Sequence, residues 1–366
     1  MAERGAVPKV PETRRRAMAL IRSFTSPLLP DDYLELVNPL WSTRELRGKV
    51  VRVERETPRA VTVTIKPGWE WPGHRPGQYV RLGIAVDGIH HWRAYSLTSA
   101  PGREDGCISI TPKLLEGGKV SPFLNGRVQP GAIVRLGGVE GTFVLPDPVP
   151  RKLLFVSAGS GVTPIMSMLR HLATDSRVED VVHVHCARTA EDVIFGAEMQ
   201  ALEREQPGYR LQLRMTGSQG RIAADDVEEM CPDWQAREAF VCGPAGLLEA
   251  MTGHWQSRGC EQRLHVERFQ ADEHVGDGER GAGGEIRFRA SAVVCHSDGE
   301  QPILAAGEQA GAELPYGCRM GICHTCVGRL RAGQVRDLRT GRVYGAPGEM
   351  VRTCVNAPEG AVEIDL

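Results

Sequence analysis

The chain has 366 residues, of which 41% are hydrophobic and 25% are charged, and 44 Lys and Arg nearly balance 46 Asp and Glu. At about 100–200 residues per domain, this length predicts two or three domains and excludes a single small module. The formal charge of −2 provides no field that would recruit polyanions, so we expect no nucleic-acid partner. No apolar run approaches the roughly 18 residues of a membrane span and no signal peptide is recognisable, which predicts a cytoplasmic protein.

A basic segment opens the chain. Residues 1–24 hold six Lys and Arg against two Glu, and the apolar residues from Arg14 onward fall on roughly one face of a helix. This pattern predicts a short amphipathic helix that contacts an anionic membrane surface. A disordered tail and a helix packed on the next domain are the alternatives. Residues 1–43 are assigned together as a basic arm and a wrapping segment.

Region 44–147 consists of short alternating runs such as 60–65, separated by Gly and Pro. Such runs predict an antiparallel β-barrel. Region 148–270 alternates buried-type strands with helical patterns, which predicts an α/β domain with a parallel sheet and a ligand site beyond the carboxyl ends of its strands. The expected elements of that domain are strand 152–157, helix 165–172, strand 181–185, helix 193–203, strand 210–215 and strand 239–242. A Gly-rich linker, 271–284, then leads to a last domain, 285–366.

Four of the ten cysteines lie close together in that last domain. Cys318, Cys323, Cys326 and Cys354 have the C-x4-C-x2-C…C spacing that is typical of plant-type 2Fe-2S ferredoxins. A structural zinc site would use paired C-x2-C knuckles, of which only one is present, and four unligated thiols this close would be prone to oxidation. The spacing therefore predicts a 2Fe-2S cluster held by these four cysteines. The resemblance to ferredoxins implies an α+β β-grasp domain.

A flavin motif is recognisable at the end of a predicted barrel strand. The run Arg93-Ala94-Tyr95-Ser96 resembles the R-x-Y-S/T motif of the ferredoxin-NADP reductase family. The resemblance implies that Arg93 pairs with the flavin phosphate, that Tyr95 lines the flavin, and that the Ser96 hydroxyl lies near flavin N5. Two further segments resemble that family: Gly77-Gln78-Tyr79-Val80 in the barrel, and a phosphate loop made of Gly117, Gly118, Lys119, Val120 and Ser121.

Two loops of the α/β domain also resemble the family's nicotinamide-binding domain. The first follows the first strand and consists of Gly159, Ser160, Gly161, Val162, Thr163 and Pro164. The second, Cys242-Gly243-Pro244, follows the fourth strand. The resemblance implies that Thr163 faces the nicotinamide and that Cys242 lies against it where hydride leaves for the flavin. Ser96, Thr163 and Cys242 are therefore the expected catalytic residues.

The choice of cofactors depends on fewer residues. Arg188 and Arg221 are positioned to pair with a 2′-phosphate, which favours NADPH over NADH. FAD is favoured over FMN, although the related phthalate reductase uses FMN. Phe269 is assigned either to the flavin site or to ordinary core packing. Arg319 and Arg352, next to cluster ligands, are expected to raise the cluster potential unless both side chains point to solvent.

The domain order resembles that of phthalate dioxygenase reductase and phenylacetyl-CoA epoxidase reductase. It implies an NAD(P)H-dependent oxidoreductase that passes electrons through a flavin and a 2Fe-2S cluster to a partner protein. Residues 27–41 resemble actinobacterial reductases that serve membrane fatty acyl-CoA desaturases, so the expected partner is such a desaturase or a hydroxylase, with membrane contact through residues 1–24. The alternatives are a reductase for a soluble ring-hydroxylating or epoxidase oxygenase and a redox sensor without turnover.

Overall fold

The computed structural model describes residues 38–42, 45–86, 89–174, 178–269, 282–316, 321, 325–338 and 341–366. The helix expected in residues 1–24 and the cluster ligands Cys318 and Cys323 lie outside these residues. The chain forms two compact units, which are taken here one at a time. The first comprises the described residues up to His90 and Tyr95–Glu267, and the second comprises His91–Ala94 and Arg268–Leu366. No helix in the described ranges combines the length and the apolar character needed to cross a membrane.

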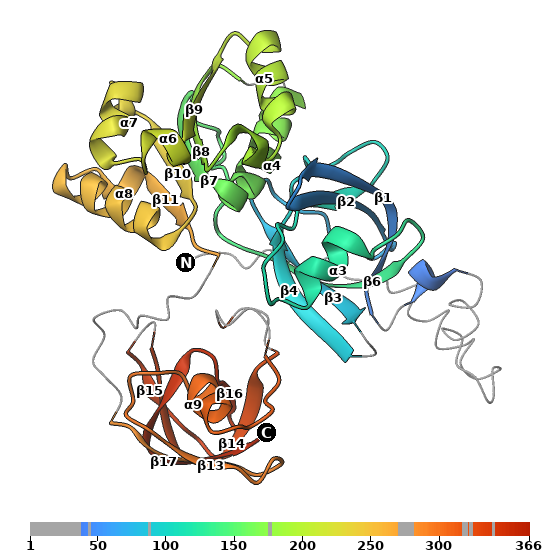
Figure 1. The fold of residues 1–366 in the computed structure, drawn as a ribbon, viewed down its shortest axis with the longest axis vertical. Coiled ribbons are helices and arrows are strands. Elements are labelled where there is room, and N and C mark those ends of the chain that lie inside the picture. The colour runs from blue at the N-terminus through green and yellow to red at the C-terminus, as the bar shows by residue number, and fades with distance from the viewer. Residues whose placement is uncertain are drawn as a thin grey trace. The chain divides into compact units, whose positions relative to one another are not determined.

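The first six strands form one sheet in the order β4-β3-β6-β1-β2-β5 (Figure 1). Their bounds are β1 Arg47–Thr57, β2 Ala60–Pro67, β3 Tyr79–Val86, β4 Ile89–Ser96, β5 Ile108–Ile110 and β6 Ile133–Glu140. A 3-10 turn, Pro39–Trp41, precedes the sheet, and helix α3, Val120–Gly126, lies between β5 and β6. β2 alternates as predicted, because Val61, Val63 and Ile65 enter the apolar core while Thr62 and Thr64 occupy the other face.

Five parallel strands form the second sheet, in the order β11-β10-β7-β8-β9. Their bounds are β7 Lys152–Ala158, β8 Asp180–Ala187, β9 Tyr209–Met215, β10 Glu238–Cys242 and β11 Leu264–Glu267. The helices are α4 Val162–Thr174, α5 Gly196–Glu205, α6 Thr216–Gln219, α7 Ala224–Met230 and α8 Ala245–Ser257, with 3-10 turns at Gly159–Gly161, Ala190–Asp192, Trp234–Ala236 and Glu261–Arg263. Figure 1 shows α4 and α5 on one side of this sheet and α7 and α8 on the other.

The predicted parallel sheet is confirmed, but some element bounds differ from expectation. Helix α4 begins at Val162, three residues before the expected start at 165, because Pro164 is accommodated in its first turn. Helix α5 begins at Gly196 and not at 193. The strand β11, only four residues long, was not expected at all.

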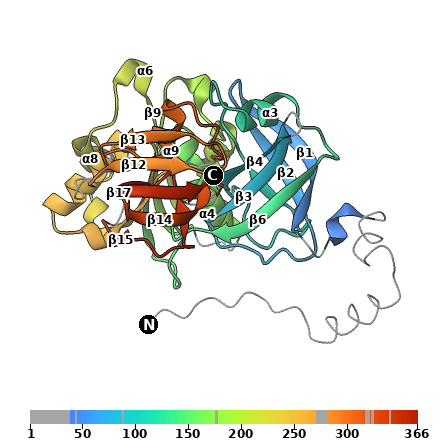
Figure 2. The ribbon, with the colours of Figure 1, turned by 90° about the horizontal axis from the view of Figure 1, so that it is seen from below.

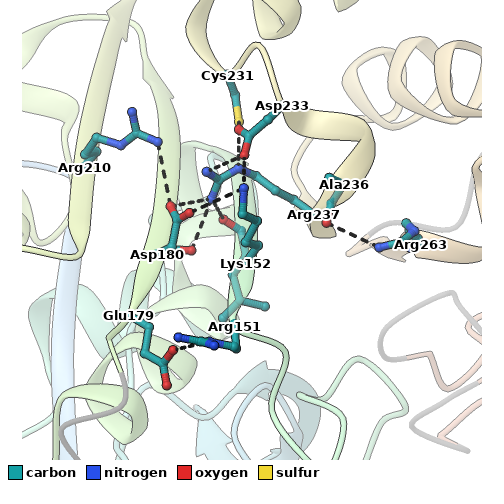
Figure 3. Close-up of polar contacts among 11 residues, drawn as sticks. Arg151, Lys152, Glu179, Asp180, Arg210, Cys231, Asp233, Ala236, Arg237 and Arg263 are labelled. Atoms are coloured by element: carbon teal, nitrogen blue, oxygen red, sulfur yellow. Dashed lines mark hydrogen bonds and ion pairs between the residues drawn. The ribbon is translucent and has the colours of Figure 1, made fainter.

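The amino ends of the parallel strands are held by a buried guanidinium (Figure 3). Arg237, 1% exposed, pairs with Asp233 at 2.7 Å and with Asp180 at 2.8 Å. It also donates to the carbonyl oxygens of Leu153 and Asp180, both at 3.2 Å. Lys152 adds a second cation 2.7 Å from Asp233. This network ties the starts of β7, β8 and β10 together at the sheet edge opposite the glycine loop.

The second unit is a small mixed sheet in the order β13-β12-β17-β14-β15, with β16 paired to β14. Figure 2 shows β12, β17 and β14 side by side. The elements are β12 Gly284–Phe288, β13 Val294–Ser297, α9 Ile303–Gln309, β14 Val327–Asp337, β15 Val343–Tyr344, β16 Met350–Arg352 and β17 Asn356–Asp365. Helix α9 contributes Ile303 and Leu304 to the core. Gly284 already belongs to β12, so the expected linker 271–284 extends one residue too far.

Candidate cofactor sites

Two glycine-containing loops meet at the carboxyl edge of the parallel sheet. One follows β7 and contains Gly161, and the other follows β10 and begins at Cys242. A Cβ added to Gly161 would lie 2.1 Å from the carbonyl oxygen of Cys242, and one added to Gly243 would lie 3.2 Å from Cβ of Ala158. The backbones of the two predicted motifs therefore pack directly against each other, with no room for a side chain at Gly161. Glycines at the carboxyl edge of a parallel sheet are positions where a ligand can approach the backbone closely.

Thr163 and Cys242 are both buried beside this surface, at 4% and 0% exposure. The Thr163 hydroxyl donates to the carbonyl oxygen of Ser160 at 2.8 Å, so it also stabilises the loop. Burial raises the pKa of the Cys242 thiol well above its usual value. Burial therefore favours the neutral thiol of Cys242 over the thiolate.

Glu267 lies beside Cys242 and was not predicted from the sequence as a candidate residue. Glu267 is the last residue of β11 and is paired with Cys242, the last residue of the neighbouring strand β10. Burial raises the pKa of its carboxyl to about 7, which makes it the one described carboxyl beside the glycine loops that gains or loses a proton near neutral pH. The available signal was an acid at the end of a short run, 264–267, in which apolar and polar residues alternate. Phe269, two residues further on, lies beyond β11.

Helix α4 connects the predicted flavin motif to the glycine loop. The motif residues Arg93–Ser96 end β4, and Ser96 is 8% exposed. Directly after them, the carbonyl oxygen of Ser99 accepts a hydrogen bond from Ser167 at 2.8 Å, and that of Thr98 accepts one from Arg170 at 2.6 Å. Because α4 also begins at the glycine loop, it fixes the end of β4 relative to Thr163.

The predicted Gly77–Val80 motif also lies against helix α4, which contains Met168. Gly77 has φ +95°, and a Cβ there would lie 2.1 Å from the carbonyl oxygen of Phe143 and 2.6 Å from Cε of Met168. Only glycine fits a position with both constraints. The carbonyl oxygen of Gln78 accepts from the amide of Leu97 at 2.9 Å, which anchors the residue that follows Ser96.

The predicted phosphate loop runs into helix α3, whose first two residues are Val120 and Ser121. Gly117 has φ +74°, and the amide of Leu115 donates to the Ser121 hydroxyl oxygen at 3.0 Å. Ser121 therefore shapes the loop by accepting this hydrogen bond. Lys113, just upstream, brings its ammonium to 3.6 Å from the Cβ position of Gly159. Lys113 was not predicted, and it adds a cation between the phosphate loop and the glycine loop.

The predicted 2′-phosphate residues lie after β8 and β9. The carbonyl oxygen of Arg188 accepts from the amide of Gly217 at 2.9 Å, so the end of β8 contacts the loop after β9. Arg214 donates to the carbonyl oxygens of Gln219 and Gly220, at 3.0 and 3.1 Å, and shapes that loop. Arg221 follows it directly and is exposed.

Two of the four predicted cluster ligands are described, and both are buried. Cys326 directly precedes β14 and is 1% exposed, and Cys354 follows β16 and is 4% exposed. Thr353 joins the two, because its amide and its hydroxyl donate to the carbonyl oxygen of Cys326 at 3.1 and 2.8 Å. The amide of Gly321 donates to Sγ of Cys354 at 3.2 Å. Buried sulfur that accepts an amide hydrogen bond fits a thiolate ligand of an iron-sulfur cluster.

Three family models match the chain in order. Residues 69–145 match the oxidoreductase FAD-binding domain, residues 155–252 the oxidoreductase NAD-binding domain, and residues 289–359 the 2Fe-2S iron-sulfur cluster binding domain. These matches fall within the barrel region, the parallel-sheet region and the second unit, in that order.

Relatives match the chain over most of its length. The chain is 48% identical, over 94% of its length and 90% of the relative, to an NADPH oxidoreductase of Mycobacterium tuberculosis. It is 30% identical to a stachydrine N-demethylase reductase subunit of Rhizobium meliloti, over 89% of this chain and 97% of the relative. Phthalate dioxygenase reductase has the same fold, with a TM-score of 0.57 and 21% identity over 87% of this chain and 97% of that chain.

Proposed function

Because the chain belongs to the ferredoxin-reductase-type NAD(P)H oxidoreductases with FAD-binding, NAD-binding and 2Fe-2S domains, we propose that it is the reductase of an oxygenase system. The observation that carries the proposal is the presence of all three redox domains in one chain. NAD(P)H donates two electrons as hydride whereas a 2Fe-2S cluster accepts one, and FAD supplies the conversion between them. The protein's own part is to position these groups.

Ser96, Thr163 and Cys242 are proposed to surround the reacting atoms. Burial of all three, together with the close contact of the two glycine loops, supports this assignment. We expect Ser96→Ala and Cys242→Ala to slow the bleaching of the flavin by NADPH in a stopped-flow experiment, each by about 10-fold or more, without loss of FAD. Unchanged rates in both variants would remove these residues from the reaction site.

Arg93, Tyr95 and the loop from Gly117 to Ser121 are proposed to hold the flavin. A guanidinium suits the flavin phosphate, and glycine amides with a hydroxyl suit a second phosphate. Arg93→Ala should release flavin on gel filtration, and chromatography of the released material identifies FAD. FMN in its place would contradict the proposal that the second loop binds a pyrophosphate.

NADPH is the proposed donor, with Arg188 and Arg221 at its 2′-phosphate. Their placement after β8 and β9 supports this assignment, as does a 48%-identical relative named as an NADPH oxidoreductase. The test compares kcat/KM for NADPH and NADH in cytochrome c reduction. Arg221→Ala should lower kcat/KM for NADPH by about 10-fold and leave that for NADH unchanged, because only NADPH carries the phosphate.

A membrane desaturase or hydroxylase is the second candidate for the terminal acceptor. The excess of basic residues in 1–24 favours it, because juxtamembrane cations bind anionic lipid. The test is co-sedimentation of the full chain with phosphatidylcholine vesicles containing phosphatidylserine, with a deletion of residues 1–24 as control. Binding that the deletion abolishes supports the membrane acceptor, and no binding supports a soluble oxygenase.

A further inference from the structure

A continuous set of contacts joins a buried carboxylate to a cluster cysteine in the second unit. Asp337 ends β14 and is 5% exposed. The guanidinium of Arg352, at the end of β16, lies 3.8 Å from the Asp337 carboxylate and donates to the carbonyl oxygen of Gly321 at 3.0 Å. The amide of Gly321 in turn donates to Sγ of Cys354 at 3.2 Å. Arg352 therefore does not point freely into solvent.

The backbone at Gly321 explains why such a contact is useful. Gly321 has φ +71°, a conformation that glycine adopts without strain but that the chain does not hold by itself. Its amide faces the cysteine sulfur while its carbonyl oxygen is bound by Arg352. The two hydrogen bonds fix the residue on both sides of its Cα. Loss of the guanidinium would leave the amide free to rotate away from the sulfur.

We propose that Arg352 is a positioning residue that sets the reduction potential of the cluster through the amide of Gly321. An amide that donates to a ligand sulfur stabilises the extra negative charge of the reduced cluster and so raises its potential. The charge of Arg352 itself contributes little, because Asp337 is its partner and the side chain is 33% exposed. The inference rests on the assignment of Cys354 as a ligand under the proposed function.

The experiment is an EPR-monitored redox titration of the full chain with its cluster. Arg352→Leu removes both the charge and the hydrogen bond, whereas Arg352→Lys keeps the charge but lacks the planar, rigid donor set of a guanidinium. We expect the reduction potential of the cluster to be lower in both variants than in wild type. The expected decrease corresponds to a change of about 10-fold in the one-electron equilibrium constant, which is about 59 mV. Arg329→Gln, on the neighbouring strand β14, removes an exposed cation without a contact to Gly321 and should leave the potential unchanged.

Two results would overturn the inference. A potential that falls in Arg352→Leu but not in Arg352→Lys would assign the effect to charge, and unchanged potentials in both would remove Arg352 altogether. If Arg352→Leu cannot retain its cluster, the rate of iron loss to a chelator is compared between Arg352→Lys and Arg329→Gln. We expect faster iron loss from Arg352→Lys. Equal rates in the two variants would contradict the proposal. Iron analysis of Cys354→Ser tests the ligand assignment separately, since a full cluster in that variant would contradict it alone.

Discussion

The backbone of Gly161 lies directly against the carbonyl group of Cys242. A Cβ at position 161 would be 2.1 Å from that oxygen and 2.5 Å from its carbon, so the two loops at the carboxyl edge can meet only through glycine. One backbone contact therefore positions Cys242 relative to the loop 159–164. Any side chain at position 161 must move one loop away from the other.

Gly161→Ala tests that relationship. We expect a loss of about 1–3 kcal/mol in the free energy of unfolding, because the added methyl group overpacks a rigid contact, and an increase in KM for NADPH. Gly253→Ala is the matched control. Gly253 lies inside α8 with nothing within 4 Å of its Cβ position, so alanine there should stabilise the protein by about 0.5–1 kcal/mol and leave KM unchanged. Equal behaviour of the two variants would contradict the account.

Arg237 should affect stability without affecting catalysis. It lies at the amino edge of the parallel sheet, away from the glycine loops, and pairs with Asp233 and Asp180. Arg237→Met leaves two carboxylates without their main cation, and we expect a clearly lower melting temperature but an unchanged KM for NADPH. A changed KM at unchanged stability would show that the network reaches the nucleotide site.

The same network should make the folding stability of the protein depend on pH. Hydrogen bonds from Arg237 hold the pKa of the Asp233 carboxyl below its usual range. A lowered pKa contributes stability above the unfolded value of about 3.9, and this contribution is lost as the pH falls. The difference in melting temperature between wild type and Arg237→Met should therefore shrink between pH 5 and pH 3.

The contribution of Glu267 to stability should depend on pH in the opposite direction. Burial raises the pKa of its carboxyl to about 7, so the unfolded chain ionises at lower pH than the folded one. The contribution of Glu267 to stability therefore falls as the pH rises from about 4.5 to about 7 and is constant above that range. The difference in melting temperature between wild type and Glu267→Gln, measured as a function of pH, isolates the contribution of Glu267. A flat difference would show that Glu267 is ionised in the folded protein throughout.

A buried hydrogen-bonded chain on the parallel sheet gives a further prediction. The hydroxyl of Ser157 lies 2.8 Å from both His183 Nε2 and His185 Nδ1, and His183 Nδ1 lies 2.8 Å from the hydroxyl of Tyr209. Tyr209→Phe leaves one buried imidazole nitrogen without a partner and should cost about 1–3 kcal/mol in urea unfolding. Ser157→Ala unpairs two nitrogens and should cost more. Ser257→Ala, at an exposed hydroxyl, should stay within about 0.5 kcal/mol.

The sequence predicted those features that depend on local pattern. The run 152–157, which is apolar from 153 to 156, and the glycines after it predicted β7 and its loop. A buried parallel strand needs consecutive apolar residues and a tight turn needs glycine, so both can be recognised from neighbouring residues alone. The cysteine spacing likewise predicted a 2Fe-2S domain, which the family model over residues 289–359 confirms, while the assignment of the four ligands stays a prediction. The short strand β11 was missed because His265 and Glu267 interrupt its apolar pattern, and only its pairing with β10 makes it a strand.

Tertiary contacts decided the rest. The raised pKa of Glu267 comes from burial, which no local pattern of charge reveals. The contact between Arg352 and Gly321 joins residues that are 31 positions apart, and the sequence could state only that a cation lies near a ligand. Lys113 reaches the Gly159 loop because the barrel and the parallel sheet pack together in one unit.

The family domains imply that one chain carries electrons from NAD(P)H through FAD to a 2Fe-2S cluster. The most direct measurement adds NADPH anaerobically to the purified full chain and follows flavin absorbance together with low-temperature EPR. We expect the flavin to bleach and the signal of a reduced 2Fe-2S cluster to appear in the same samples. A bleached flavin with a cluster that stays oxidised, or zinc in place of iron and acid-labile sulfide, would contradict this expectation.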